Sequence, residues 1–147
     1  MDHPRKKTGS EYPVQPQVAV GAVVFKNDRV LLVRRGKAPS SGLWAIPGGR
    51  VELAETLQEA AEREIREETG ITVKAREPVF TFDVVDRDDT GGIRFHYVIV
   101  DLAADYVAGE LRPGDDALDA RWVSAREIRD LDVSEKTREL LMQTFGL

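Results

Sequence analysis

Three glutamates in one short segment have a spacing that could bind a metal ion. Glu64, Glu67 and Glu68 follow the pattern E-x-x-E-E within residues 48–71. If this segment is an α-helix, the rotation of about 100° per residue places them toward the side of its apolar residues. Carboxylates in that position repel one another and lose solvation unless a cation lies among them. Hard divalent cations prefer such oxygen ligands, so the spacing suggests a site for Mg²⁺ or Mn²⁺.

The same glutamates also fit a charged helix whose C-terminal half leaves the core. Arg63 and Arg66 could then pair with them as ordinary surface ion pairs. Helical geometry alone leaves both interpretations open. The preceding residues Pro47-Gly48-Gly49 favour the metal site, because a turn with two glycines can bring backbone carbonyls and amides close to the helix.

The elements that must position these residues predict one α/β domain. Thr56 and Glu59 have the spacing of a capping box, so we expect a helix from Thr56 to Thr69, with Gly70 as its left-handed end. Alternating or continuous apolar runs predict strands at 18–25, 29–35, 71–75, 78–85, 93–106 and 120–124. Two further helices are expected at 124–131 and 134–145, each with serine as its N-cap. Residues 1–16 are expected to be a flexible tail, and 17–147 a single α/β (α+β) sandwich.

Composition excludes several classes of protein. The chain has 147 residues and no cysteine, which removes disulfides, thiolate metal sites and thiol nucleophiles. Its formal net charge of −5 argues against stable electrostatic binding to nucleic acid. No apolar run approaches the roughly 20 residues of a membrane helix, and the N-terminus does not have the pattern of a secretory signal. We therefore expect a cytoplasmic protein that acts on small molecules, without nucleic-acid or membrane partners.

The acidic segment also matches a known signature at every specified position. The pattern consists of Gly49, five residues, Glu55, seven residues, Arg63-Glu64-Ile65, one residue, Glu67-Glu68, one residue and Gly70-Ile71. This resembles the Nudix box, and the fixed spacing makes chance a poor explanation. The resemblance extends over roughly residues 17–147. It implies a Nudix-type α/β/α sandwich around a mixed β-sheet, in which a loop–helix–loop holds divalent metal.

The resemblance implies roles for the residues of the box. Glu64 and Glu68 would be metal ligands, and Glu67 would share the site. A carbonyl of Gly48 or Gly49 would be a further ligand.

Two residues would support these ligands. Arg63 would hold a glutamate in place through an ion pair. Glu55 would brace Arg63 or bind metal through water.

The catalytic base has several candidates. The box itself could supply it, or a later loop at 109–119 could do so. In that loop Asp115 and Asp116 are the first candidates, ahead of Asp119 and Glu110. A solvated acidic turn is the alternative interpretation of the loop.

Some residues outside the box could bind substrate. Arg34 and Arg35 end an expected strand, and alternation should point one of them toward the cleft, where it could bind phosphate; a surface pair is the alternative. Trp44 could stack on a base or pack in the core. Phe80 and Phe82 share one strand face and could line a base pocket or belong to the core.

The resemblance predicts a Mg²⁺-dependent hydrolase that cleaves the pyrophosphate bond of a nucleoside diphosphate derivative. The segments around the box resemble the branch often labelled ADP-ribose pyrophosphatase, which would convert ADP-ribose into AMP and ribose 5-phosphate. The alternative is a MutT-like (d)NTP pyrophosphohydrolase, and a third reading is a nucleotide sensor without catalysis. The sequence is compatible with a homodimer.

Overall fold

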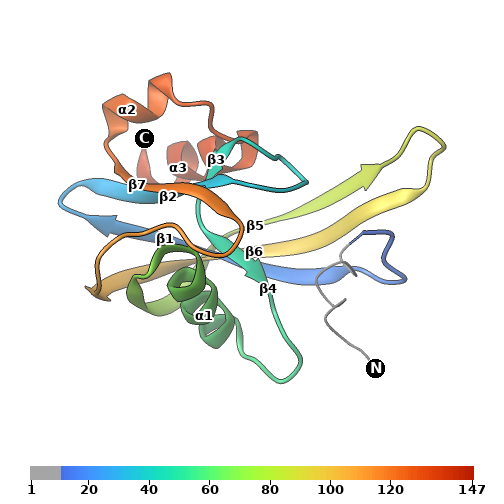
Figure 1. Cartoon of the computed structure of the whole chain (residues 1–147), viewed down its shortest axis with the longest axis horizontal. Helices are drawn as coiled ribbons and strands as arrows, with labels where there is room; N and C mark the ends of the chain where they lie inside the picture. The colour runs from blue at the N-terminus through green and yellow to red at the C-terminus, as the bar shows by residue number, and fades with distance from the viewer. Residues whose placement is uncertain (1–10) are drawn as a thin grey trace.

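A mixed β-sheet forms the centre of the molecule in the computed structural model, which describes residues 11–147 (Figure 1). Its strands are β1 (Gln17–Lys26), β2 (Arg29–Arg35), β3 (Trp44–Ala45), β4 (Gly48–Arg50), β5 (Thr72–Arg87), β6 (Ile93–Ala108) and β7 (Ala117–Val123). The helices are α1 (Leu57–Thr69), α2 (Ala125–Asp130) and α3 (Glu135–Phe145). None of these helices is long and apolar enough to cross a membrane.

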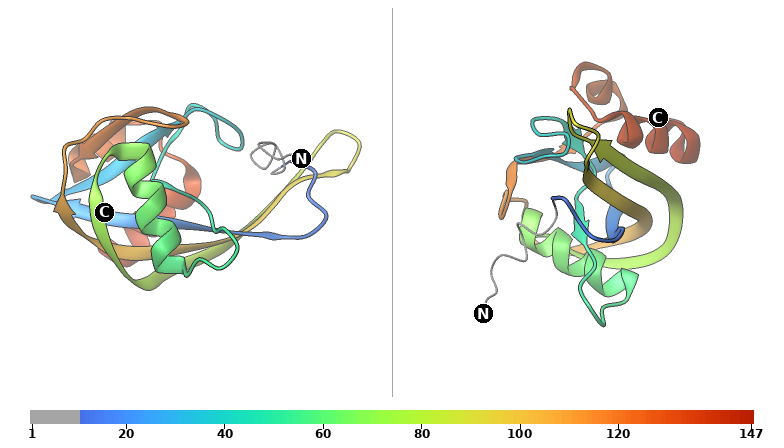
Figure 2. Two further views of the ribbon diagram at one scale, coloured as in Figure 1. Left: turned by 60° about the horizontal axis from the view of Figure 1, so that its bottom comes forward. Right: turned by 90° about the vertical axis from the view of Figure 1, so that its right-hand side faces the viewer.

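The sheet has the order β3-β2-β1-β6-β5, while β4 pairs with β1 and β7 pairs with β2. Strand β1 runs parallel to β6 and antiparallel to β2 and β4, which makes the sheet mixed. Helix α1 lies on one side of the sheet, and α2 and α3 lie on the other (Figures 1 and 2). The expected α/β/α sandwich is therefore confirmed.

Two apolar cores hold these layers together, one on each side of the sheet. Under α1, the buried residues Ala60, Ala61 and Ile65 pack against β1, β2, β5 and β6. Under α2 and α3, Ile128, Leu140 and Leu141 are among the buried residues, together with side chains of β1, β2, β3 and β7. The sheet thus separates the acidic helix α1 from the two C-terminal helices.

Helix α1 has the ends that the sequence predicts. The hydroxyl of Thr56 accepts a hydrogen bond from the Glu59 amide (3.0 Å), and the Glu59 carboxylate accepts one from the Thr56 amide (2.9 Å). Gly70 adopts the left-handed conformation with φ 77°. Both ends are therefore fixed by local interactions.

The segment after Pro47 differs from its expected turn. Gly48 and Gly49 lie in β4, where they pair with Gly21 and Val20 of β1. A Cβ atom on Gly48 would overlap the backbone carbonyl of Val20. The glycine pair therefore permits a close approach of two strands, and not only a turn.

Two strands also differ in extent from the prediction. The expected strands 71–75 and 78–85 form the single strand β5, with register shifts on both sides of Pro78. Proline lacks an N–H group for the ladder, and the strand accommodates it as an irregularity and continues. Strand β7 begins at Ala117, inside the expected loop 109–119, because residues 117–123 pair with β2.

The expected tail is only partly covered by the structure, since residues 1–10 lie outside the described residues. Beyond them, the amide of Tyr12 donates to the carbonyl of Arg94 (2.8 Å), and its hydroxyl donates to Asp88 (2.8 Å). Glu11 pairs with Arg94 at 2.8 Å. Residues 11 and 12 thus contact the long β5–β6 hairpin, which projects from the body of the molecule (Figure 1).

Removing the apolar anchor of α1 should destabilise the fold. Ile65 is fully buried under the sheet, so Ile65→Ala should lower the free energy of unfolding by about 2–4 kcal/mol. Leu53 is fully exposed, and Leu53→Ala is the matched control with a change of less than about 0.5 kcal/mol. Urea unfolding followed by circular dichroism measures both. Equal effects of the two variants would contradict this packing.

Candidate metal and active site

Arg63 organises the acidic surface at the end of α1. Its guanidinium donates to both carboxylate oxygens of Glu55 (2.6 and 2.9 Å) and to Glu64 (2.9 Å). A further N–H donates to the backbone carbonyl of Arg50 (3.0 Å). Glu67 lies at 3.4 Å from the same guanidinium and is half exposed. The Arg63 guanidinium thus links α1, the loop before it and the end of β4.

Gly49 allows Glu64 to lie against β4. A Cβ atom at this position would overlap the carboxyl group of Glu64. The Glu64 side chain is largely buried, and this burial raises the pKa of its carboxyl, while Arg63 opposes the shift. The structure therefore places the Glu64 carboxyl directly against Gly49, and a role of the Gly49 carbonyl as a metal ligand stays a prediction.

Glu68 is the most deeply buried carboxylate of the box. Its Oε1 accepts a hydrogen bond from the Gly48 amide (3.0 Å). Burial raises the pKa of Glu68 to about 8, the Gly48 hydrogen bond and Arg35 lower it, and the charges of Glu64 and Asp115 raise it further. A proton therefore occupies this carboxyl near neutral pH when no cation is bound.

The loop between β6 and β7 packs onto the C-terminal end of α1. The amides of Arg112 and Gly114 donate to the carbonyls of Thr69 and Glu68, both at 2.9 Å. These bonds satisfy carbonyls that the helix leaves unpaired. They also hold the next residue, Asp115, beside the glutamates.

Three carboxylates meet where this loop approaches the helix. Oxygens of Glu64, Glu67 and Asp115 all lie within 4.8 Å of one another. Carboxylates this close together repel one another. A divalent cation bound among them would offset the repulsion, because such ions prefer oxygen ligands. Glu68 is not part of this trio, and its role as a ligand stays a prediction.

The two aspartates of the loop have different surroundings. Asp115 belongs to the trio and adopts a left-handed backbone conformation with φ 53°. Asp116 forms an ion pair with Lys37 (2.9 Å), and its carbonyl lies so close to Gly36 that a Cβ atom there would overlap it. The structure therefore brings Asp115, and not Asp116, into the acidic cluster.

The two arginines at the end of β2 also differ. Arg35 lies close enough to Glu68 to lower its pKa, and its Nε donates to the Pro39 carbonyl (2.7 Å). Arg34 donates to the Gly42 carbonyl (3.1 Å) and is exposed. Arg35 is thus the arginine next to the acidic cluster. A phosphate-binding role for either side chain stays a prediction.

Trp44 lies away from this cluster, in the core under α2 and α3. Its side chain is buried, and the Arg121 guanidinium lies 4.9 Å from the centre of its ring. This position fits the core-packing interpretation, and a stacking role is left as a prediction.

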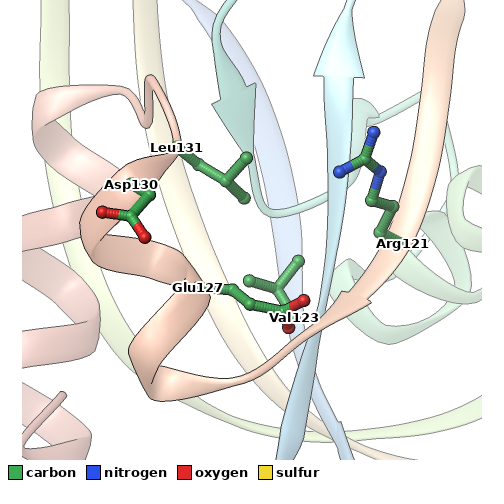
Figure 3. Close-up of a pocket in the computed structure, with 5 residues that line it drawn as sticks. All are labelled: Arg121, Val123, Glu127, Asp130 and Leu131. Carbon is green, nitrogen blue, oxygen red and sulfur yellow. The ribbon is translucent and has the colours of Figure 1, made fainter.

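A separate shallow pocket lies between β7 and α2 (Figure 3). Its lining consists of Arg121, Val123, Glu127, Asp130 and Leu131. None of these residues belongs to the acidic cluster. The candidate metal site is therefore the cluster of side chains at the end of α1, and this pocket is not part of it.

Sequence reasoning missed the interactions that bring the loop to the helix. The bonds from Arg112 and Gly114 use backbone amides, which no side-chain pattern reveals. Gly114 carries a weak signal, because a Cβ atom there would lie 2.5 Å from the carbonyl oxygen of Glu67. A glycine beside two aspartates could therefore have indicated a close approach.

Comparisons with known proteins agree with this geometry. The NUDIX domain family model matches residues 15–144. The chain is 36% identical over 118 residues to the ADP-ribose pyrophosphatase of Methanocaldococcus jannaschii, covering 80% of this chain and 68% of that protein. The chain therefore belongs to the Nudix family.

Solved structures share the fold. The MutT Nudix hydrolase of Burkholderia pseudomallei superimposes with a TM-score of 0.76 at 30% identity, covering 88% of this chain and 98% of that chain. A bifunctional NMN adenylyltransferase/ADP ribose pyrophosphatase from Francisella tularensis, in complex with AMP and a Mn ion, gives 0.67 at 30% identity. That match covers 87% of this chain and 40% of the other. Divalent metal use is typical of this family.

Neutralising Glu68 should stabilise the metal-free protein at alkaline pH. A raised pKa means that the folded protein binds more protons than the unfolded chain, so stability falls as pH rises from about 4.5, the ordinary value, to about 8. Glu68→Gln removes this loss. The difference in Tm between the variant and the wild type should therefore grow through this range and level off above it.

Thermal unfolding in the presence of a chelator, measured across this pH range, checks the expectation. Glu77→Gln is the matched control, because Glu77 is exposed and its side chain lies outside the cluster. If the Tm of the wild type and of Glu68→Gln changed with pH in the same way, burial of the Glu68 carboxyl would not lower stability at alkaline pH, and the expectation would be wrong.

Proposed function

We propose that this Nudix protein is a Mg²⁺-dependent pyrophosphohydrolase that converts ADP-ribose into AMP and ribose 5-phosphate. The observation that carries the proposal is the trio of Glu64, Glu67 and Asp115, with mutual distances within 4.8 Å. The relative from Methanocaldococcus jannaschii, named as an ADP-ribose pyrophosphatase, supports the choice of substrate.

The donor set fits a hard divalent cation. All three groups offer carboxylate oxygens, the ligands that Mg²⁺ prefers. Glu64, Glu67 and Asp115 would hold the metal, which would offset the charge of the pyrophosphate and make a water molecule more acidic. The Mn ion in the Francisella tularensis structure supports a divalent metal of this kind.

The chain's own residues have separate tasks in this reaction. Arg63 fixes the Glu64 carboxylate before substrate arrives, because its guanidinium is held by Glu55 and the Arg50 carbonyl. In this proposal Asp115, which lies beside Glu64 and Glu67, would accept a proton from the attacking water. Arg35, whose charge lowers the pKa of Glu68, would bind a phosphate oxygen.

The alternatives from the sequence have less support. A sensor without catalysis would not need the complete set of box carboxylates, which this chain retains. A (d)NTP pyrophosphohydrolase would use the same acidic cluster, so only products distinguish it. A cytoplasmic location and a homodimer remain predictions.

A substrate panel with product identification tests the function. With Mg²⁺, we expect AMP and ribose 5-phosphate from ADP-ribose, and slower turnover of NADH, diadenosine polyphosphates and NTPs. Glu64→Gln should abolish turnover, because it removes a charged ligand. Release of pyrophosphate from NTPs without turnover of ADP-ribose would replace the substrate assignment. Nucleotide binding without any turnover would favour the sensor.

The two aspartates of the loop provide a matched pair for testing the base. Asp115→Asn should lower kcat by about 100-fold or more, the usual contribution of general acid–base catalysis. Asp116→Asn should retain most of the kcat, because Asp116 forms an exposed ion pair with Lys37. Steady-state kinetics at saturating Mg²⁺ measures both. Equal losses, or a larger loss at Asp116, would move the base elsewhere.

A further inference from the structure

Asp101 is a buried carboxyl group that the acidic cluster does not use. It lies in the middle of β6 and is 4% exposed. Its backbone pairs with β1 and β5, and within residues 11–147 no charged or hydrogen-bonding group shifts the pKa of its carboxyl. Its Oδ1 lies over Gly21 of β1, at a position that a Cβ atom would overlap, and next to Ile46. Moving a carboxyl group largely out of water costs free energy, so its presence calls for an explanation.

The protonation state of Asp101 follows from burial. Desolvation raises the pKa of Asp101 to about 7, and it is the one cause of the shift. Helix α3 packs over this side of the sheet with a charged pair, Lys136 and Glu139 (3.4 Å), and neither residue contributes to the shift. Below about pH 7, Asp101 therefore offers both an O–H donor and a carbonyl acceptor.

Two aromatic rings accompany this carboxyl. Phe80 of β5 is the direct partner of Asp101 in the strand register, which places both side chains on one side of the sheet. The rings of Phe80 and Phe82 have centroids 5.6 Å apart, and both side chains are half-buried. The Lys136 ammonium lies 5.5 Å from the centre of the Phe82 ring. The cluster thus combines flat apolar surface with a hydrogen-bonding pair.

The register of the sheet connects this cluster to the acidic site. Gly21 pairs with Gly48 on one side and with Asp101 on the other. Two strand spacings separate Gly48 from Asp101, a distance of roughly 10 Å. The Gly48 amide donates to Glu68. A ligand with its phosphates at the acidic cluster can therefore extend along this row toward Asp101.

We propose that Asp101 is a specificity-determining residue that recognises the adenine base of the substrate. The neutral carboxyl donates its O–H to the ring nitrogen N1 and accepts from the exocyclic amine N6, while Phe80 and Phe82 contact the ring. Ile46, which is half-buried over the carboxyl, rotates away to admit the base. An ionised carboxylate would lose the donor and with it the match to adenine. This inference rests on the proposed nucleotide substrate.

Two substitutions separate hydrogen bonding from burial. Asp101→Asn keeps a donor and an acceptor but cannot ionise, whereas Asp101→Leu has a similar volume and neither group. The probe is AMP, and ribose 5-phosphate is the control ligand because it has a phosphate and no base. Titration calorimetry at about pH 6 and about pH 8.5 spans the ionisation of Asp101.

In the wild type, we expect the ratio of the Kd for AMP to the Kd for ribose 5-phosphate to rise about tenfold between these pH values, as loss of one hydrogen bond requires. Asp101→Asn should keep, at both pH values, the low Kd ratio that the wild type shows at about pH 6. Asp101→Leu should show a ratio about tenfold higher at both. Unchanged ribose 5-phosphate binding in both variants shows that they fold.

A wild-type ratio in Asp101→Leu at both pH values would overturn the assignment. Failure of the two proposals can be distinguished, because AMP binding requires no turnover. A preference for AMP that does not change in Asp101→Leu, with intact hydrolysis of ADP-ribose, would remove only the role of Asp101. A correct binding pattern without hydrolysis would remove only the proposed reaction.

Discussion

The guanidinium of Arg63 is the interaction on which the acidic surface depends. It donates to Glu55, Glu64 and the Arg50 carbonyl, so it joins the end of β4, the following loop and α1. A planar fork with several fixed donors can do this, whereas the single ammonium of a lysine cannot. The Glu64 carboxylate is therefore ordered before any ligand arrives, and binding does not have to supply that ordering.

The same arrangement has an energetic cost in the metal-free protein. Glu64 and Glu68 are both carboxyls whose pKa is raised by burial, and Arg63 offsets the shift only at Glu64. The Gly48 amide gives Glu68 partial compensation through one hydrogen bond. A chain under selection for stability alone would replace such groups. Retaining them is understandable where a cation completes the charge balance.

Local signals in the sequence predicted the elements whose ends are fixed by neighbouring residues. Thr56, Glu59 and Gly70 define α1 through contacts within one or two turns, and the structure confirms them. Strand β4 could not be predicted in this way, because its pairing with β1 depends on a partner distant in sequence. The sequence named Asp115 and Asp116 as candidates but could not choose between them, since backbone hydrogen bonds of the loop bring Asp115 to the glutamates. For the pair Arg34 and Arg35, alternation left the choice open.

The sheet carries two different groups of residues on its two sides and fixes their positions relative to one another. On one side, α1 presents carboxylates at the edge of β4; on the other, Asp101 and Phe80 face α3. Gly21 stands between them, and its missing side chain leaves room for the Asp101 carboxyl. The paired backbone of β4, β1 and β6 thus fixes the distance between the acidic cluster and the proposed base site at Asp101. Loops could vary either function separately, but only the pairing of β1 with β4 and β6 can hold both in place.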